Sequence, residues 1–356
     1  MNEVLSSMGW SERLHEAWVS CTREGMVPGR VVRAERERFV VWTEHGERPA
    51  TLGGRLRHEA LDAADLPVVG DWVALSLDGE SGVVRRLLPR WSVFVRKAAG
   101  TGARAQLVAA NVDAVFLVLA MNGDFNLRRL ERYLAAAWES GAEPVVVLTK
   151  RDLALDPDAL TDAARAAAPG ASVVAVSAPR GDGLDALAVH LRAGATVALI
   201  GSSGAGKSTL LNALAGAEVM STGGLRERDE RGRHTTTHRE LVRLPSGALL
   251  IDTPGMRELG MWEVDEGVSL AFDDVAALAE ECRFRDCAHA GEAGCAVAEA
   301  LAEGALSEAR FASYQKLARE AAFQARRSDP RLAAEARAKW KRVSVAARRS
   351  GKGRDQ

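Results

Sequence analysis

The stretch Thr196–Leu214, TVALIGSSGAGKSTLLNAL, decides the fold of this chain of 356 residues. It contains the pattern G-x-x-x-x-G-K-[ST] at Gly201–Ser208. The apolar run Thr196–Ile200 predicts a buried strand, and the leucine spacing from Ser208 onward predicts a helix. Between such a strand and helix, a glycine-rich loop turns its backbone N–H groups toward a phosphate. A glycine-rich turn with an exposed lysine is the alternative.

The loop also supplies the side chains that a nucleotide needs. We expect Lys207 to reach the β- and γ-phosphates and the Ser208 hydroxyl to ligate Mg²⁺. The residues expected to contact the phosphates are Gly201, Ser202, Ser203, Gly204, Ala205, Gly206, Lys207, Ser208 and Thr209.

Two further motifs indicate selectivity for guanine. Thr149-Lys150-Arg151-Asp152 follows the predicted strand Pro144–Leu148 and fits the pattern [NT]-K-x-D. In this pattern the carboxylate of Asp152 accepts hydrogen bonds from N1–H and N2–H₂ of guanine. Adenine lacks that pair of donors and would leave the carboxylate unpaired. Ser177 and Ala178 follow another predicted strand and fit the loop that closes over the base.

A fourth motif completes the set at the γ-phosphate. Asp252-Thr253-Pro254-Gly255 follows the apolar run Ala248–Ile251 and fits the pattern D-x-x-G. Asp252 is expected near Mg²⁺ through a water, and the N–H of Gly255 near the γ-phosphate. The polar segment Glu218–Arg239 lies where a nucleotide-dependent switch belongs. Within it we expect Thr236 to ligate Mg²⁺, with Thr235 a close second.

The residue that follows the D-x-x-G motif is Met256. Ras-like enzymes use a glutamine near this position to orient the attacking water, and methionine has no group for that task. Intrinsic hydrolysis is therefore expected to be slow. His234 is the nearest catalytic candidate in the sequence, and local packing or hydrogen bonding within the switch is its alternative role.

The order of these motifs is unusual, because the base-reading motifs precede the phosphate loop. A parallel sheet gathers the loops at its carboxyl edge whatever the order of its strands, so the site survives the rearrangement. The sequence therefore predicts a multidomain α/β protein whose centre is a circularly permuted GTPase.

Short β-prone runs between Gly29 and Leu88 predict a small OB-type barrel. Arginines interleaved with these runs suit RNA binding, and a surface of mixed charge is the equal alternative because glutamates lie among them. Before the barrel, Met1–Met26 predicts a helical lead-in that docks its tryptophans.

Near the C-terminus, three thiols and an imidazole fall close together at Cys282, Cys287, His289 and Cys295. Three thiolates and one imidazole suit a structural tetrahedral Zn²⁺ with no open position. The alternative to a zinc site is that the four residues are unrelated, or that two of the cysteines form a redox pair. Only four cysteines occur in the whole chain, which argues against a disulfide scaffold.

The net charge of −1 gives no general attraction to nucleic acid. The segment from Lys316 to Gln356 is nevertheless rich in lysine and arginine. It is expected to face RNA, with a solvated tail as the alternative. No secretory signal and no apolar run long enough for a membrane span are visible, so we expect a cytosolic protein without membrane contact. Nothing suggests a self-pairing surface, and a monomer is expected.

Together with Gly70-Asp71-Trp72-Val73, these motifs resemble the bacterial ribosome small-subunit-dependent GTPase A family, RsgA or YjeQ, over nearly the whole chain from Gly29. The resemblance implies a GTPase with 16S rRNA and GTP/GDP as partners. It would act late in maturation of the 30S subunit, which would stimulate hydrolysis, and His234 would be the catalytic histidine. Thr149 departs from the family, which usually has asparagine there. The expected domains are residues 1–28, 29–97, 98–268 and 269–356.

Other functions remain open at the level of the sequence. A GTPase acting on another RNA or ribonucleoprotein would carry the same motifs. A small-molecule kinase or ATPase would use the same phosphate loop, although the pair Lys150 and Asp152 argues against it. An RNA-binding module with a vestigial nucleotide site would not need an intact Lys207, Ser208 and Asp252.

Overall fold

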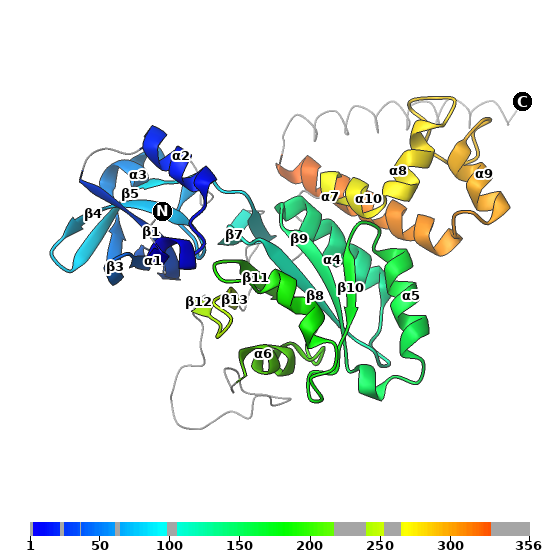
Figure 1. The fold of residues 1–356 in the computed structure, drawn as a ribbon. Coiled ribbons are helices and arrows are strands. Elements are labelled where there is room, and N and C mark those ends of the chain that lie inside the picture. Colours follow the sequence, from blue (N-terminus) through cyan, green and yellow to red (C-terminus); the bar gives the residue numbers. More distant parts are fainter. Residues whose placement is uncertain are drawn as a thin grey trace, which may run out of the picture.

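The computed structural model describes residues 3–21, 25–35, 37–60, 65–97, 105–216, 240–252 and 265–328 (Figure 1). Several expectations lie outside these residues: the switch at 218–239 with His234, Thr235 and Thr236, the motif residue Gly255, and the basic segment beyond Ser328.

Five strands form the predicted barrel. They run in the order β1-β2-β3-β5-β4, and β4 pairs with β1 to close the ring. All neighbouring pairs are antiparallel except β3 and β5. The strands are β1 (Met26–Glu35), β2 (Arg38–Thr43), β3 (Gly46–Leu52), β4 (Trp72–Asp78) and β5 (Ser81–Leu87). The short helix α3 (Gly54–Glu59) follows β3.

Side chains that alternate between buried and more exposed positions along the strands fill the barrel. Phe39 and Val41 of β2 point inward while their neighbours are more exposed, as the two-residue period of a strand requires. The residues of β3 do not themselves predict a strand, because Gly46–Leu52 contains few β-prone residues. The strand forms because pairing with β2 starts directly at the hairpin, where Thr43 faces Gly46.

The central sheet is the predicted permuted nucleotide domain. Its order is β10-β9-β8-β11-β13-β12, and all strands are parallel except β12. The phosphate-loop strand β11 is therefore central, although β8 to β10 precede it in the sequence. The strands are β8 (Ala114–Ala120), β9 (Glu143–Thr149), β10 (Ser172–Ala175), β11 (Thr196–Ile200), β12 (Glu240–Arg243) and β13 (Leu249–Asp252).

Helices cover both faces of this sheet, and β8 shows why. Every residue of β8 is buried. Val115 and Leu117 pack with α4 (Leu127–Ser140) and α5 (Pro157–Ala167), whereas Phe116 packs with α6 (Lys207–Ala215) on the opposite face. A strand buried on both faces is continuously apolar rather than alternating. Two 3₁₀ helices lie at Arg151–Leu153 and Leu184–His190.

A buried arginine joins the barrel to the nucleotide domain. The side chain of Arg30, on β1, is fully buried and donates to the carbonyl oxygens of Met8 and Asn111 and, at 2.7 Å, to the hydroxyl of Thr196. Thr196 is the first residue of the phosphate-loop strand. Burial lowers the pKa of Arg30 to about 10. The guanidinium also lies 5.6 Å from the ring centroid of Trp72, part of the Gly70–Val73 motif.

The lead-in before the barrel packs against this junction. It forms two helices, α1 (Glu3–Ser7) and α2 (Glu12–Cys21), rather than one. Trp10, between them, is buried, and its ring lies 4.9 Å from that of Trp72 in an edge-on arrangement. The expectation that the lead-in docks through a tryptophan agrees with this packing.

A hairpin of β6 (Val93–Lys97) and β7 (Ala105–Ala110) connects the two domains. The domains also share one sheet. Arg33 of β1 pairs with Glu240 of β12, and their side chains form an ion pair at 2.6 Å.

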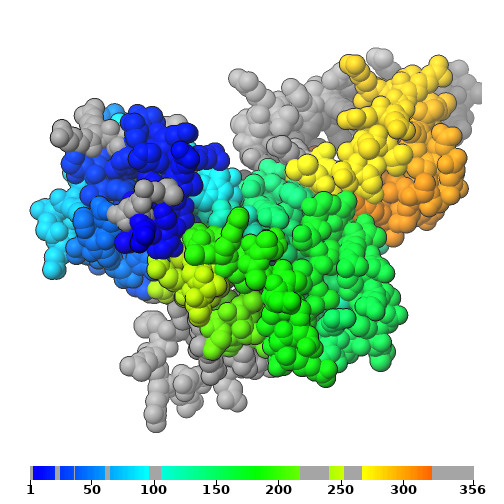
Figure 2. All heavy atoms as spheres, viewed as in Figure 1, coloured from blue at the N-terminus to red at the C-terminus, as the bar shows by residue number. Residues whose placement is uncertain are grey.

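The C-terminal helices dock on α4. They are α7 (Asp265–Ala271), α8 (Asp273–Glu280), α9 (Ala296–Glu303) and α10 (Glu308–Ser328). At Gly267 of α7 an added Cβ would lie 2.1 Å from the carbonyl oxygen of Ala135, so only glycine allows this close approach to α4. Figure 2 shows the barrel, in blue, and these helices, in yellow and orange, on opposite flanks of the green nucleotide domain.

A buried ion-pair cluster fixes this docking. Glu131 of α4 is almost fully buried, accepts from Arg310 at 3.1 Å and also from the Ser313 hydroxyl. Arg310 bonds to Asp274 at 2.7 and 2.8 Å. Burial raises the pKa of Glu131, although the donors from Ser313 and Arg310 oppose the shift.

Candidate functional site

The phosphate loop connects the end of β11 to the start of α6. Lys207 opens α6, one residue before the predicted helix start, and its Nζ donates to the carbonyl oxygens of Gly201 and Ser202 at 2.6 and 2.5 Å. Gly206 has φ of +89°, which a side chain would strain. The structure shows no side-chain cap at Gly206, and the N-terminus of α6 lies at the loop, where a helix favours an anion. Ser208 and Thr209 follow within the first turn.

The predicted base-reading motif lies against this loop. Thr149, which ends β9, is 2% exposed, and its Oγ1 donates to the carbonyl oxygen of Ala205 at 2.6 Å. The hydroxyl therefore fastens the phosphate loop to the strand that carries the base-reading motif. The sequence showed that threonine stands where the family usually has asparagine, but it did not reveal this hydrogen bond.

The carboxylate expected to read guanine is held by a second loop. Asp152 Oδ1 accepts from Ser177 Oγ at 2.7 Å, and this bond lowers the pKa of Asp152. Lys150 has φ of +59° just before the 3₁₀ turn that carries Arg151 and Asp152. Ala178, after Ser177, packs partly buried at the edge of the same core as α6. Three motifs that are separate in the sequence thus lie at one edge of the sheet.

An acidic residue that sequence reasoning missed also lies at this edge. Asp124 Oδ2 accepts from Ser202 Oγ at 2.9 Å and from Arg129 Nη1 at 2.7 Å. The hydrogen bonds from Arg129 and then Ser202 lower the pKa of Asp124. The signal was the segment Asn122–Asn126, which contains two asparagines and Asp124 and begins two residues after the apolar strand β8 ends.

Asp252 is the last residue of β13, the neighbour of β11. Its backbone therefore ends at the same edge as the phosphate loop. Gly255, Thr236 and His234 lie beyond the described residues, and their predicted roles stay predictions.

The second candidate site is a cluster of three cysteines and a histidine. The ligand atoms of Cys282, Cys287, His289 and Cys295 all lie within 4.8 Å of one another. Nδ1 of His289 is 3.6 Å from Sγ of Cys282 and 3.5 Å from Sγ of Cys295, and these two sulfurs are 3.9 Å apart. Ligands of a tetrahedral zinc ion lie about 3.5–3.8 Å apart, given metal–ligand bonds of about 2.0–2.3 Å. The donor set and its spacing therefore fit such an ion.

The loop that carries these ligands is well supported. The carboxylate of Glu292 accepts from the backbone N–H groups of Ala288 and Ala290, and Cys295 caps the N-terminus of α9. Phe311 of α10 lies edge-on to the ring of His289. The cluster thereby joins the loop to α9 and α10.

Comparisons with known proteins identify the family. The profile of the RsgA GTPase family matches residues 87–262. The small ribosomal subunit biogenesis GTPase RsgA of Opitutus terrae is 51% identical over 351 residues, which cover 96% of each chain. The chain belongs to the RsgA GTPase family.

Other members cover almost as much of the chain. The small ribosomal subunit biogenesis GTPase RsgA of Streptomyces coelicolor is 45% identical over 96% of this chain and 93% of its own. An ABC transporter profile also matches residues 184–348, a range that includes the phosphate loop. That loop pattern is shared by many nucleotide-binding proteins.

Solved structures of RsgA-type proteins have the same fold. The crystal structure of YjeQ from Thermotoga maritima has a TM-score of 0.64 at 28% identity and covers 83% of this chain and 98% of its own. YloQ, described as a circularly permuted GTPase, has a TM-score of 0.62 at 25% identity, with 85% and 96% covered. The predicted permutation is thus confirmed.

Membership of the RsgA family makes the chain a GTP hydrolase, and the family's activity implies Mg²⁺ with the nucleotide. The site of three cysteines and a histidine is able to hold a metal ion. Among the described residues, no helix combines the length and the apolar character needed to cross a membrane.

Proposed function

We propose that this RsgA-family GTPase binds the small (30S) ribosomal subunit and acts late in its maturation. In this proposal the subunit stimulates hydrolysis of GTP to GDP and phosphate. The observation that carries the proposal is the identity of 51% across 96% of both chains with a protein named for small-subunit biogenesis. Its direct partner would be 16S rRNA, it would work as a monomer, and it would act in the cytoplasm, where subunits assemble.

The nucleotide would bind along the carboxyl edge of the central sheet. Asp152 would accept the guanine donors, oriented by its bond from Ser177. Lys207 would exchange its two loop carbonyl partners for phosphate oxygens, and the uncapped N–H groups of α6 would add further donors. The remaining contacts would come from Thr149, Lys150, Arg151, Ala178, the rest of the phosphate loop through Thr209, and the D-x-x-G residues Asp252 and Gly255.

Ser208 and Thr236 would hold Mg²⁺, which when bound would neutralise charge on the phosphate oxygens. His234 would orient or deprotonate the attacking water, since Met256 has no polar group for this. We assign the metal of the cysteine–histidine cluster as one structural Zn²⁺, because three thiolates and an imidazole leave no open position for chemistry.

The geometry suggests how nucleotide state would reach both flanking domains. The segment between α6 and β12 is the proposed switch, and Glu240 at its end is paired with Arg33 of the barrel. The D-x-x-G motif precedes α7 in the sequence, and α7 packs on α4 and contacts α8, the helix before the zinc ligands. Ordering of the switch by the γ-phosphate would therefore alter how the barrel and the zinc module hold rRNA. The working units would be the predicted domains 1–28, 29–97, 98–268 and 269–356.

The test of the function is GTP turnover with purified 30S subunits, with 50S subunits and ATP as controls. We expect slow turnover alone and strong stimulation by 30S subunits only. Equal rates under all conditions would refute the ribosomal assignment and leave the GTPase itself standing.

A second experiment tests the coupling. Replacing residues 260–266 with a flexible linker of equal length should leave GDP affinity unchanged. It should also remove the difference in 30S affinity between the GTP and GDP states. Unchanged coupling would refute the route through α7.

A further inference from the structure

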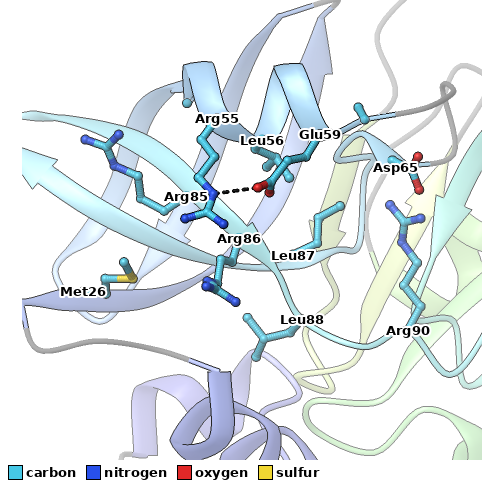
Figure 3. Close-up of a pocket in the computed structure, with 12 residues that line it drawn as sticks. Met26, Arg55, Leu56, Glu59, Asp65, Arg85, Arg86, Leu87, Leu88 and Arg90 are labelled. Atoms are coloured by element: carbon cyan, nitrogen blue, oxygen red, sulfur yellow. Dashed lines mark hydrogen bonds and ion pairs between the residues drawn. The ribbon is translucent and has the colours of Figure 1, made fainter.

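A pocket opens on the barrel, away from the nucleotide site. It lies between α3 and β5 and has a volume of about 590 Å³, within the range of about 300–1,000 Å³ typical of small-molecule sites. None of its lining residues belongs to the proposed GTP or zinc sites. In Figure 3, Arg86 lies between the paired side chains of Arg55 and Glu59 and the side chain of Leu88.

Four arginines line the pocket, but two are occupied. Arg90 bonds to Asp71 at 2.7 and 2.6 Å and to the carbonyl oxygen of Leu66. Arg55 pairs with Glu59 at 2.6 Å. These two guanidinium groups therefore already have carboxylate partners.

The other two arginines are available to an anion. Arg85 donates through Nε to Ser76, and among the described residues no carboxylate pairs with its two terminal nitrogens. Within the part of the chain that the structure describes, the side chain of Arg86 forms no hydrogen bond or ion pair, and the side chains of both arginines are exposed. A planar guanidinium matches the geometry of a phosphate and binds it with two parallel hydrogen bonds.

Four large apolar side chains also line the pocket. They are those of Met26, Leu56, Leu87 and Leu88, and Leu56 and Leu87 are anchored against the barrel core. Unpaired bases stack on guanidinium planes, and flipped-out bases also pack against apolar side chains. Guanidinium groups that can hold a phosphate beside apolar side chains that can pack against a base suit a nucleoside phosphate.

We propose that this pocket takes one nucleoside phosphate unit, supplied by an unpaired nucleotide of an RNA strand. The proposal rests on the proposed ribosomal function and names one place where the barrel touches RNA. The two carboxylates in the lining are engaged, Glu59 with Arg55 and Asp65 beside Arg90. The pocket therefore offers stacking and phosphate contacts rather than a pattern of base-reading groups.

The location differs from the usual nucleic-acid face of an OB-type barrel. That face is formed by the second and third strands, with the loops that join strands 1 and 2 and strands 4 and 5. The pocket is instead formed by α3 and β5. It would therefore hold a nucleotide of the RNA that lies beyond the edge of the usual binding face.

The test uses the full chain saturated with GDP, so that the GTPase site is occupied. Fluorescein-labelled tetrauridylate is the RNA probe, read by anisotropy, and CMP and inorganic phosphate are competitors. Arg86→Gln should weaken binding by at least about tenfold, as expected for a lost hydrogen bond to a charged group. Arg86→Lys should retain part of the affinity. Arg165→Gln, which removes an exposed arginine from α5, is the matched control and should change affinity less than about twofold.

Equal affinity of the wild type and Arg86→Gln for tetrauridylate would overturn the proposal. Binding of CMP as tight as that of tetrauridylate would overturn the assignment to an RNA strand, because the site would then serve free nucleotides. Turnover stimulated by 30S subunits is measured alongside. Stimulation without an Arg86 effect refutes only the pocket, whereas an Arg86 effect without stimulation refutes only the ribosomal function.

Discussion

The hydroxyl of Thr149 offers a sharp test of how the nucleotide site is held together. Thr149→Val keeps the shape of the side chain and removes the donor to the carbonyl oxygen of Ala205. Thr149 and Ala205 are 2% and 0% exposed, so water cannot replace the lost partner. A buried acceptor left unpaired costs about 1–3 kcal/mol.

That free energy should divide between stability and nucleotide binding. If the loop is fastened equally with and without GDP, the whole cost appears as lower stability, or roughly 2–12 °C in melting temperature for a domain of this size. If fastening matters only when GDP is bound, affinity falls by about five- to 150-fold. We therefore expect the two losses together to amount to about 1–3 kcal/mol.

The assay combines thermal unfolding with dissociation of a fluorescent GDP analogue. Thr149→Ser keeps the hydroxyl and is the matched control, and Thr149→Asn should also function because its amide is a donor. Wild-type stability and GDP release in Thr149→Val would refute the reasoning. So would an equal defect in Thr149→Ser, because the hydroxyl would then not be the cause.

Three further changes test the other sites. Asp152→Asn turns an N–H toward the guanine donors, so GTP should bind about 100-fold more weakly relative to XTP, whose base carries a carbonyl at that position; competition against the fluorescent GDP analogue measures this, and an unchanged preference would contradict the assigned role. Cys282→Ser should lose the bound zinc measured by metal analysis while Cys21→Ser keeps it, and equal zinc in both would remove Cys282 from the ligand set. For Glu131, burial raises the folded-state pKa above the unfolded value, so the folded protein takes up a proton first as the pH falls. The melting temperature of the wild type should therefore rise relative to that of Glu131→Gln between pH 7 and pH 5, and a constant difference would argue against the raised pKa.

The sequence predicted the centre of this fold well because its signals are local. The phosphate loop, the base-reading motif and the D-x-x-G motif each follow an apolar run, and parallel strands bring their ends to one edge. The cysteine–histidine cluster could also be predicted from the sequence, because its four ligands lie within fourteen residues, Cys282 to Cys295. Short spacing and distinctive residue types were sufficient in both cases.

The contacts that join the domains could not be predicted in this way. Nothing near Arg30 in the sequence distinguishes it from the exposed arginines of the barrel, yet it is fully buried against a residue 166 positions later. Glu131 is likewise an ordinary helical glutamate until Arg310 and Ser313 approach it. The strand β3 was missed because pairing with its neighbours, rather than its own residues, makes it a strand.

The position of Arg30 also bears on how the chain folds while it is being made. The barrel strand that carries Arg30 leaves the ribosome long before Thr196, 166 residues later. At about 5–20 residues per second, the interval is roughly 8–33 s. Throughout that time the guanidinium lacks its partner on the phosphate-loop strand and must stay hydrated. The first domain to be synthesised therefore completes its burial only when the central domain folds against it, and a pause in translation between the two prolongs the exposure of that surface.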